Sequence, residues 1–357
     1  MKPAHIEEFD GLRAIAVMAV MAAHFMGGAL PSFGFGAFGV QMFFVLSGFL
    51  ITGILLEGTE RIRSNSSSVG QEMRTFYIRR FLRIFPVYYL VVFVAALIGI
   101  AAVRDYLGWH VLYATNFLVV ELQHFPDPAG VFWTLAVEEQ FYLLWPAVVL
   151  LVPRRAFVPL VVALILSAIV FRGATALLTP IKYGTLLPAN LDSLCGGALL
   201  AALHQKNANL KQIAVILTAL AIAAAIFLPQ KQLDEANVTL LSSQSRLAMV
   251  LYGMTAVHFA ATWTGAKALA FLRLAPLTYV GKISYGVYLY HLFVSHFFNM
   301  AGLSMSVLAG FVIKSGLTIL VATVSWFAFE RPINNLKKRF PYRRPNPPIT
   351  NEPLPVA

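Results

Sequence analysis

Three ionisable side chains interrupt the first apolar stretch of the sequence. Asp10, Arg13 and His24 lie within residues 9–24, where most other positions are apolar or small. On a helix, Arg13 and His24 are separated by about 1100° of rotation and ~16 Å of rise, so both project from nearly the same face. A charged group in hydrocarbon is costly unless it faces a protein interior or a watery cavity. The pair therefore marks a candidate functional site, although a surface-reaching arginine and a core histidine would also fit the pattern.

The same helix and a later one carry groups suited to acid–base chemistry. Asp10 precedes Arg13 by three residues, so a helix brings the two together as an ion pair. His24 is a candidate general base for a hydroxyl, with a carboxylate nearby to orient or charge it. Glu138 and Glu139 stand inside an apolar run and point about 100° apart on a helix. At least one of these carboxylates must face the protein interior.

An arginine cluster precedes the third apolar run. Arg79, Arg80 and Arg83 lie within five residues of one another, and Arg80 and Arg83 share one helical face. Planar guanidinium groups in such a cluster suit phosphate binding. Contact with anionic lipid explains the same composition.

Other polar residues inside apolar runs are candidates for substrate binding. These candidates are Ser47, Trp133, Asp192, Tyr288 and His291. Residues 36–52 also contain several glycines, a pattern that helix packing alone explains. Ser284, Tyr288 and His291 follow at i, i+4 and i+7 and so share one helix face. No His-x3-His or His-Glu-x2-His spacing occurs, so the sequence predicts no metal site.

The composition indicates a membrane protein. Of 357 residues, 59% are hydrophobic and 12% are charged, and the mean hydropathy is +0.73. Soluble proteins carry about 25% charged residues. The repeated apolar runs predict an all-α integral membrane protein. The net charge of +11 resides in short loops between the runs, a distribution that sets topology and does not indicate nucleic-acid binding. The single cysteine excludes a disulfide framework.

We expect a bundle of about ten transmembrane helices. The spans cover about 11–28, 36–57, 84–103, 133–152, 156–178, 185–203, 212–228, 244–263, 283–300 and 306–329. With both termini cytoplasmic, 20 Lys and Arg lie on the cytoplasmic side and four outside, in keeping with the positive-inside rule. We expect 58–83 to form a long basic loop, and 104–132 to dip into the membrane or lie on it. Residues 1–330 form the transmembrane domain and 331–357 a basic, proline-rich cytoplasmic tail.

Taken in order, these segments resemble the membrane acyltransferase-3 family of bacterial ten-helix enzymes that O-acylate sugars and related acceptors. The resemblance covers about residues 5–335. It lies in Phe-Asp-Gly-Leu-Arg13 with His24, Gly39-Val-Gln-Met-Phe-Phe-Val-Leu-Ser-Gly-Phe-Leu50, Arg80-x2-Arg83, Trp133-Thr-Leu-Ala-Val-Glu-Glu-Gln-Phe-Tyr142, Asp192, Ile283-Ser-Tyr-Gly-Val-Tyr-Leu-Tyr-His291 and Glu330-Arg-Pro332. The chain departs from the family at Asn190, where many members have arginine or an aromatic residue. We also expect no fused periplasmic hydrolase-like domain.

The resemblance implies an enzyme of the bacterial cytoplasmic (inner) membrane. It would transfer an acyl group, usually acetyl from acetyl-CoA, to a hydroxyl of a carbohydrate or glycolipid. Arg13 and His24 would be required for activity, with Glu138 or Asp10 assisting. The residues implied at the acyl-CoA donor are Arg80, Arg83, Arg13 and Arg79. The acceptor, the acyl chain length and the oligomeric state stay open.

A proton-coupled secondary transporter is the alternative. Carboxylates and histidines within spans can relay protons. The sequence shows no inverted repeat and no matching pair of broken helices, which such transporters often contain. Transport would also leave the basic cluster before the third span unexplained.

Overall fold

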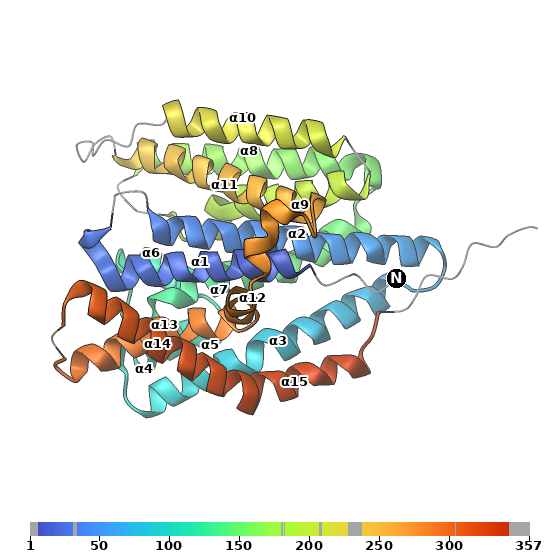
Figure 1. Cartoon of the computed structure of the whole chain (residues 1–357). Coiled ribbons are helices and arrows are strands. Elements are labelled where there is room, and N and C mark those ends of the chain that lie inside the picture. The colour runs from blue at the N-terminus through green and yellow to red at the C-terminus, as the bar shows by residue number, and fades with distance from the viewer. Residues whose placement is uncertain are drawn as a thin grey trace, which may run out of the picture.

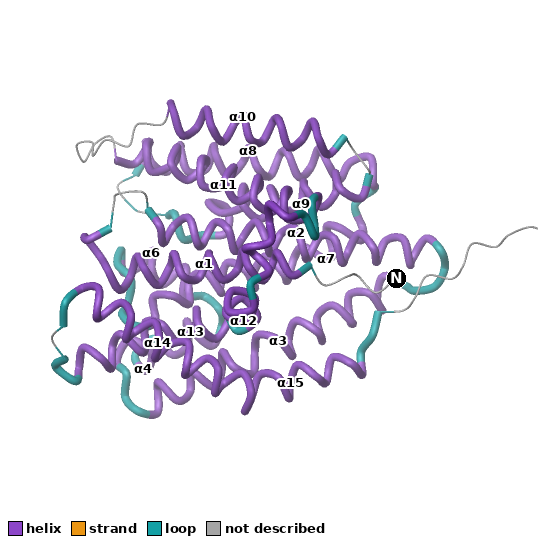
Figure 2. The backbone as a smooth tube through the Cα atoms, viewed as in Figure 1, coloured by secondary structure: helices purple, strands orange, loops and turns teal. Residues whose placement is uncertain are grey.

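The computed structural model describes residues 6–30, 34–179, 181, 183–206, 209–227, 238–303 and 305–342, and these residues form helices and connections without a strand (Figures 1 and 2). The helices are α1 (Glu7–Met26), α2 (Phe35–Arg63), α3 (Val69–Leu97), α4 (Ala101–Arg104), α5 (Leu107–Val111), α6 (Thr115–Leu122), α7 (Phe132–Leu151), α8 (Arg154–Leu178), α9 (Leu191–Gln205), α10 (Leu210–Phe227), α11 (Val238–Thr262), α12 (Ala275–Lys282), α13 (Ser284–Met300), α14 (Val307–Ser325) and α15 (Arg331–Asn335). The long helices run side by side (Figure 1).

Six of the helices in the described part of the chain are long and apolar enough to cross a membrane. They are α1, α2, α3, the segment Ala129–Leu151, α8 and the segment Val307–Arg339. In α11, residues Arg246–Thr262 join Lys267–Arg273 at a bend of 105°, which makes a seventh candidate. Shorter helices occupy the remaining predicted spans, among them α9 with 15 residues and α13 with 17.

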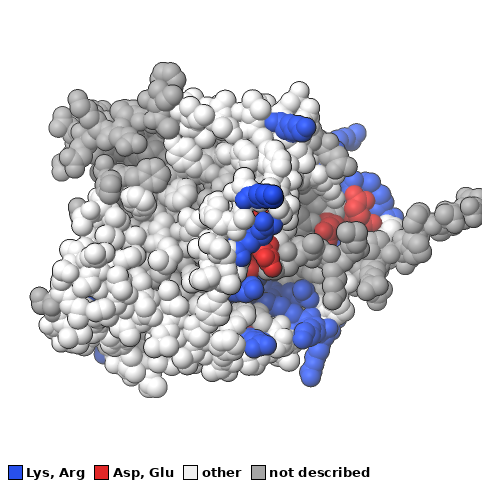
Figure 3. Space-filling model, viewed as in Figure 1, with Lys and Arg blue, Asp and Glu red and all other residues white. Residues whose placement is uncertain are grey.

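The two ends of the bundle differ in charge. On the face shown in Figure 3, Lys and Arg gather toward the end where α15 and the first turn of α1 lie. We call this the basic end; the connections after α2, α7, α9 and α12 also belong to it. The opposite end carries the connections after α1, α3, α8 and α13. This separation is typical of a protein with one fixed orientation in a membrane.

The stretch 58–83 is not the long basic loop that the sequence predicted. Helix α2 continues to Arg63 and α3 begins at Val69, so the connection is only 64–68. Ser68 and Gln71 form a capping box that starts α3, an arrangement that satisfies two free backbone N–H groups. The buried Arg61 guanidinium donates to both carboxylate oxygens of Glu72 at 2.9 and 2.8 Å and holds the two helix ends together.

The connection 104–132 is largely helical and packs on the bundle. Buried His110 in α5 bonds the Thr115 hydroxyl at 2.8 Å and the Ala102 carbonyl at 3.0 Å. The Tyr88 hydroxyl of α3 donates to the His110 carbonyl at 2.8 Å. These bonds provide hydrogen-bond partners for buried polar groups of the connection, which would otherwise have none.

Close helix packing in the centre requires glycines. A Cβ on Gly48 of α2 would lie 1.8 Å from the Leu194 carbonyl oxygen, and one on Gly197 of α9 would lie 2.0 Å from that of Val45. At the basic end, a Cβ on Gly281 of α12 would lie 1.9 Å from the Asp10 carbonyl oxygen. Small residues let helices approach closely in membranes. The resulting contacts fix α1, α2, α9 and α12 relative to one another.

We expect Gly197→Ala to lower the thermal midpoint of the protein in detergent. The added methyl group has to push α9 away from α2, and overpacking of this kind costs about 1–3 kcal/mol. The matched control is Gly173→Ala in α8, where nothing lies within 4 Å of the added Cβ. An equal response of both variants would contradict the packing assignment.

Candidate active site

A cavity of about 400 Å³ lies within the bundle and extends from its basic end. Its walls come from α1, α2, α3, α7, α12, α13 and the chain that follows α14. Apolar side chains cover much of the wall, and the polar and charged residues that line it are Asp10, Arg13, Ser47, Arg80, Arg83, Thr134, Glu138, Tyr142, Lys282, Ser284, Tyr285, Tyr288, Glu330 and Asn334. A cavity of this volume, with mainly apolar walls and a few polar groups, is typical of sites that bind small molecules.

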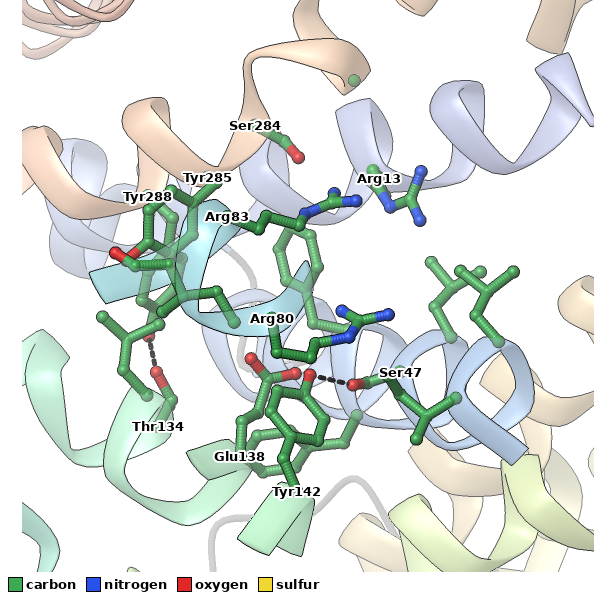
Figure 4. A pocket seen from close by; sticks show the side chains of 18 of the residues that line it. Arg13, Ser47, Arg80, Arg83, Thr134, Glu138, Tyr142, Ser284, Tyr285 and Tyr288 are labelled. Atoms are coloured by element: carbon green, nitrogen blue, oxygen red, sulfur yellow. Dashed lines mark hydrogen bonds between the residues drawn. The ribbon is translucent and has the colours of Figure 1, made fainter. Parts of the chain in front are cut away.

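The basic side of the cavity is made by three arginines. Arg13, Arg80 and Arg83 point toward one another across it (Figure 4). Arg13 pairs with Asp10 at 2.8 Å, as the sequence predicted. Neither Arg80 nor Arg83 has a carboxylate within 4 Å among the described residues; instead, the Arg80 guanidinium lies over the rings of Phe76 and Tyr142, at 5.8 and 5.4 Å. Their free donors suit an anionic ligand.

Arg79 has a different environment from its two neighbours. Its Nη1 donates to the carbonyl oxygens of Lys337 and Phe340, both at 3.0 Å. The ring of Tyr342 lies between two guanidinium groups, 5.2 Å from Arg79 and 4.9 Å from Arg61. Arg79 therefore ties the segment after α14 to α3 and is not among the residues that line the cavity.

Sequence reasoning missed Lys282 and Lys337. Lys282 of α12 lines the cavity, and the attachment of the segment after α14 brings Lys337 near Arg79, Arg80 and Arg83. Both lysines had been counted only as topology determinants. The contact between Arg79 and the Lys337 backbone joins residues 258 positions apart, which local spacing cannot reveal.

Glu138 forms a polar trio with Ser47 and Tyr142. The Ser47 and Tyr142 hydroxyls are hydrogen bonded to each other, and the Glu138 carboxylate lies beside them (Figure 4). Sequence reasoning included Glu138 and Ser47 but not Tyr142. The signal was present, because Tyr142 follows Glu138 by four residues and so shares its helix face.

At its far end the cavity is closed by Tyr288. The Thr134 hydroxyl donates to the Tyr288 hydroxyl oxygen at 2.7 Å, and the Tyr288 ring packs edge-on against Phe43, with ring centroids 6.0 Å apart. Tyr285 beside it donates to the Ile84 carbonyl at 3.0 Å. This wall separates the cavity from a histidine pair at the opposite end of the bundle.

The histidine pair consists of His24 on α1 and His291 on α13. His291 Nε2 lies 3.3 Å from His24 Nδ1. His291 Nδ1 lies 2.6 Å from the Tyr288 carbonyl, and His24 Nδ1 lies 2.9 Å from the Val20 carbonyl. Because a carbonyl oxygen only accepts, each Nδ1 carries the hydrogen and the neutral rings keep their lone pairs on Nε2. The His24 side chain is exposed, so its Nε2 lone pair is available to a substrate.

Not all of the predicted site residues meet. The predicted residues that do line the cavity are Asp10, Arg13, Ser47, Arg80, Arg83, Glu138 and Tyr288. His24 and His291 adjoin its closed end. Trp133 packs against Phe44 and Phe125 instead, with ring centroids 6.2 and 6.4 Å apart. Asp192 is buried and pairs with Arg172 at 2.7 Å, away from the cavity.

Histidine, cysteine and acidic residues do not gather into a possible metal site in the described parts of the chain. The His204–His258 pair, 3.0 Å apart, has no third such partner there. His258 Nε2 is already engaged by the Leu210 carbonyl at 2.9 Å.

Comparison with known proteins defines the class of molecule. Residues 6–327 match the family model described as "Acyltransferase domain". The chain belongs to this acyltransferase-3 family, and its apolar helices make it a multi-pass membrane protein. Membership argues against the transporter alternative. No solved structure matches the chain.

Several curated proteins are similar to it. Peptidoglycan O-acetyltransferase OatA of Listeria monocytogenes is 30% identical over 161 residues, which are 41% of this chain and 24% of that protein. O-acetyltransferase OatA of Staphylococcus aureus is 29% identical over 260 residues, 66% of this chain and 39% of that protein. The putative acetyltransferase ORF330 of Acidianus two-tailed virus is 27% identical over 249 residues, 68% and 72% of the two chains. The match to either OatA protein therefore spans well under half of that protein's length.

The Asp192–Arg172 pair yields a prediction that separates stability from substrate binding. Removing one charge of a buried ion pair leaves the other uncompensated, at a cost of about 3–5 kcal/mol. We expect Asp192→Asn to lower the thermal midpoint markedly, and the folded fraction to keep its KM for donor and acceptor. A stable variant with a raised acceptor KM would instead assign Asp192 to the substrate.

Proposed function

We propose that this protein is a bacterial inner-membrane O-acetyltransferase. It moves an acetyl group from cytoplasmic acetyl-CoA to a hydroxyl of a cell-envelope or exported carbohydrate or glycolipid. The observation that carries the proposal is a single cavity that begins at Arg80 and Arg83 and ends at Tyr288, directly beside the His291–His24 pair. The names of the OatA relatives support O-acetyl transfer.

The proposed topology has ten spans with both termini in the cytoplasm. The spans are α1, α2, α3, α7, α8, α9, α10, α11, α13 and α14. The gathering of Lys and Arg at the basic end supports this orientation. It places the arginines of the cavity on the cytoplasmic side and His24 near the outer side.

The donor's phosphates would bind at the basic end of the cavity. Arg80 and Arg83 supply guanidinium donors without a carboxylate partner among the described residues, and Arg13 lies beside them. Charge-assisted hydrogen bonds of this kind are stronger than neutral ones. The apolar walls beyond the arginines accommodate the arm of the donor, which carries the thioester toward Tyr288.

His24 would perform the acid–base chemistry. Its Nε2 takes the proton of the acceptor hydroxyl as that oxygen bonds to the acyl carbon. The carbon–sulfur bond then breaks, and the thiolate regains a proton from His24 and leaves as the free thiol. The Val20 carbonyl and His291 orient the ring, and neither Glu138 nor Asp10 is among its hydrogen-bond partners.

Direct transfer is the simplest route that fits this arrangement. An acyl intermediate on the Ser47 hydroxyl would need a base beside it, but Ser47 is bonded to Tyr142, and its hydrogen-bond partners do not include His24. Glu138 and Asp10 would instead balance the arginines while the donor is absent, because opposite charges in one cavity lower the cost of burial.

The central test is a reaction of the purified protein with labelled acetyl-CoA and cell-envelope glycans. Release of free thiol together with labelled glycan supports the proposal. Movement of a solute across liposomes without either product would favour transport. Mass spectrometry of envelope glycans from cells with and without the protein identifies the acceptor.

We expect Arg83→Ala to raise the KM for acetyl-CoA. A hydrogen bond to a charged group contributes about 1.5–3 kcal/mol, which corresponds to roughly 10- to 100-fold. Arg74→Ala on the same helix is the matched control, since its side chain is exposed and does not line the cavity. An unchanged KM in Arg83→Ala would remove this residue from the donor site.

We expect His24→Ala to abolish acetyl transfer while expression and the thermal midpoint stay near those of the native protein. General-base catalysis contributes about 10²- to 10⁴-fold, and the ring is exposed, so its removal leaves little empty space. Steady-state rates and thermal unfolding measure the two effects separately. Retention of most activity would contradict the assignment of His24 as the base.

A further inference from the structure

Lys314 is a cation inside the bundle that the proposed mechanism does not use. It lies on α14, seven residues after the helix begins at Val307 at the opposite end of the bundle. Its side chain is half-buried, and Val312 and Ile313 beside it are exposed apolar residues. An ionisable residue at such depth indicates a function unless another group neutralises it.

Three cations of the spans are neutralised by carboxylates. Arg13 pairs with Asp10 at 2.8 Å, Arg61 with Glu72 at 2.8 Å, and Arg172 with Asp192 at 2.7 Å. Two others, Arg79 and Arg246, are held by backbone carbonyl oxygens instead. Among the described residues, the ammonium group of Lys314 has neither kind of partner.

The surroundings of Lys314 stabilise its charge but do not cancel it. The ammonium group donates to the Ser295 hydroxyl at 3.3 Å and to the Asn299 side-chain carbonyl at 3.2 Å. It also lies over the rings of Phe298 and Phe25, at 5.0 and 5.9 Å from their centroids. Ring faces and neutral dipoles attract a cation. Because an ammonium has three donors, one remains for a ligand.

The position of Lys314 connects it to the proposed base. Phe25, which contacts the ammonium, follows His24 in α1 and packs on His291, with ring centroids 6.1 Å apart. Asn299 is exposed, so the cation is reached from the end of the bundle where the acceptor would enter. Phe25 and His291 thus link Lys314 to His24 through successive contacts.

We propose that Lys314, with Asn299, binds an anionic oxygen group of the acceptor, and that the acceptor is therefore an acidic carbohydrate bearing carboxylate or phosphate groups. This inference rests on the proposed function, since it assigns the acceptor of the same reaction. The charge contact fixes the sugar while one of its hydroxyls faces His24 Nε2. Neutral carbohydrates lack this anchor.

The test measures binding in the absence of acetyl-CoA. The full-length protein is placed in nanodiscs of phosphatidylcholine and equilibrated with a labelled trisaccharide of galacturonic acid or with its methyl ester, which has the same ring hydroxyls and no charge. We expect the native protein to bind the acid about tenfold more tightly than the ester. Lys314→Met should lose this difference and Lys314→Arg should retain most of it. Lys211→Met, an exposed lysine at the basic end, should behave as the native protein.

A second arm distinguishes the sugar from a lipid headgroup. The measurement is repeated with phosphatidylglycerol in the nanodiscs, and lipid that remains bound is counted by native mass spectrometry. Loss of bound phosphatidylglycerol in Lys314→Met with unchanged sugar binding would assign the site to lipid and overturn the proposal. Equal binding of acid and ester by the native protein would also overturn it. Charge-selective binding by a protein that transfers no acetyl group would refute the proposed function but support the anion site.

Discussion

The high cost of an unpaired charge in a low-dielectric bundle is the constraint on which the rest of this structure depends. Cations of the framework avoid this cost by pairing with carboxylates, as Arg61 does with Glu72 and Arg172 with Asp192. The first pair joins the end of α2 to the start of α3, and the second joins α8 to α9. Arg80 and Arg83 avoid the cost of an unpaired charge differently, because their side chains face a cavity. Arg13 has both properties, because it pairs with Asp10 and also lines the cavity.

Features that depend on local spacing could be predicted from the sequence. The Asp10–Arg13 pair and the shared helix face of Tyr288 and Ser284 follow from the 3.6-residue period, and the structure contains both. The same reasoning required at least one of Glu138 and Glu139 to face the interior, and Glu138 lines the cavity. Periodicity holds wherever a helix forms, so these predictions needed no knowledge of which helices are neighbours.

Features that depend on tertiary contacts could not be predicted. The sequence predicted that Arg79, Arg80 and Arg83 form one phosphate-binding cluster, yet Arg79 is turned toward the segment after α14. Asp192 looked like a site residue because its partner Arg172 lies on another helix. The error at 58–83 was avoidable, since Ser68 and Gln71 carry the spacing of a capping box. The charges of that stretch obscured its helical period.

Tyr288 has a consequence for the integrity of the membrane. An enzyme whose donor and acceptor lie on opposite sides risks becoming a leak for protons and ions, which would dissipate the energy stored across the bilayer. In this protein, the Tyr288 hydroxyl bonded to Thr134 and the ring packed on Phe43 close the cavity before it reaches the histidine pair. The acyl chain of a bound donor would have to displace this seal and fill the opening itself. Acyl transfer across the membrane and closure of the membrane to ions would then both depend on the Tyr288 side chain.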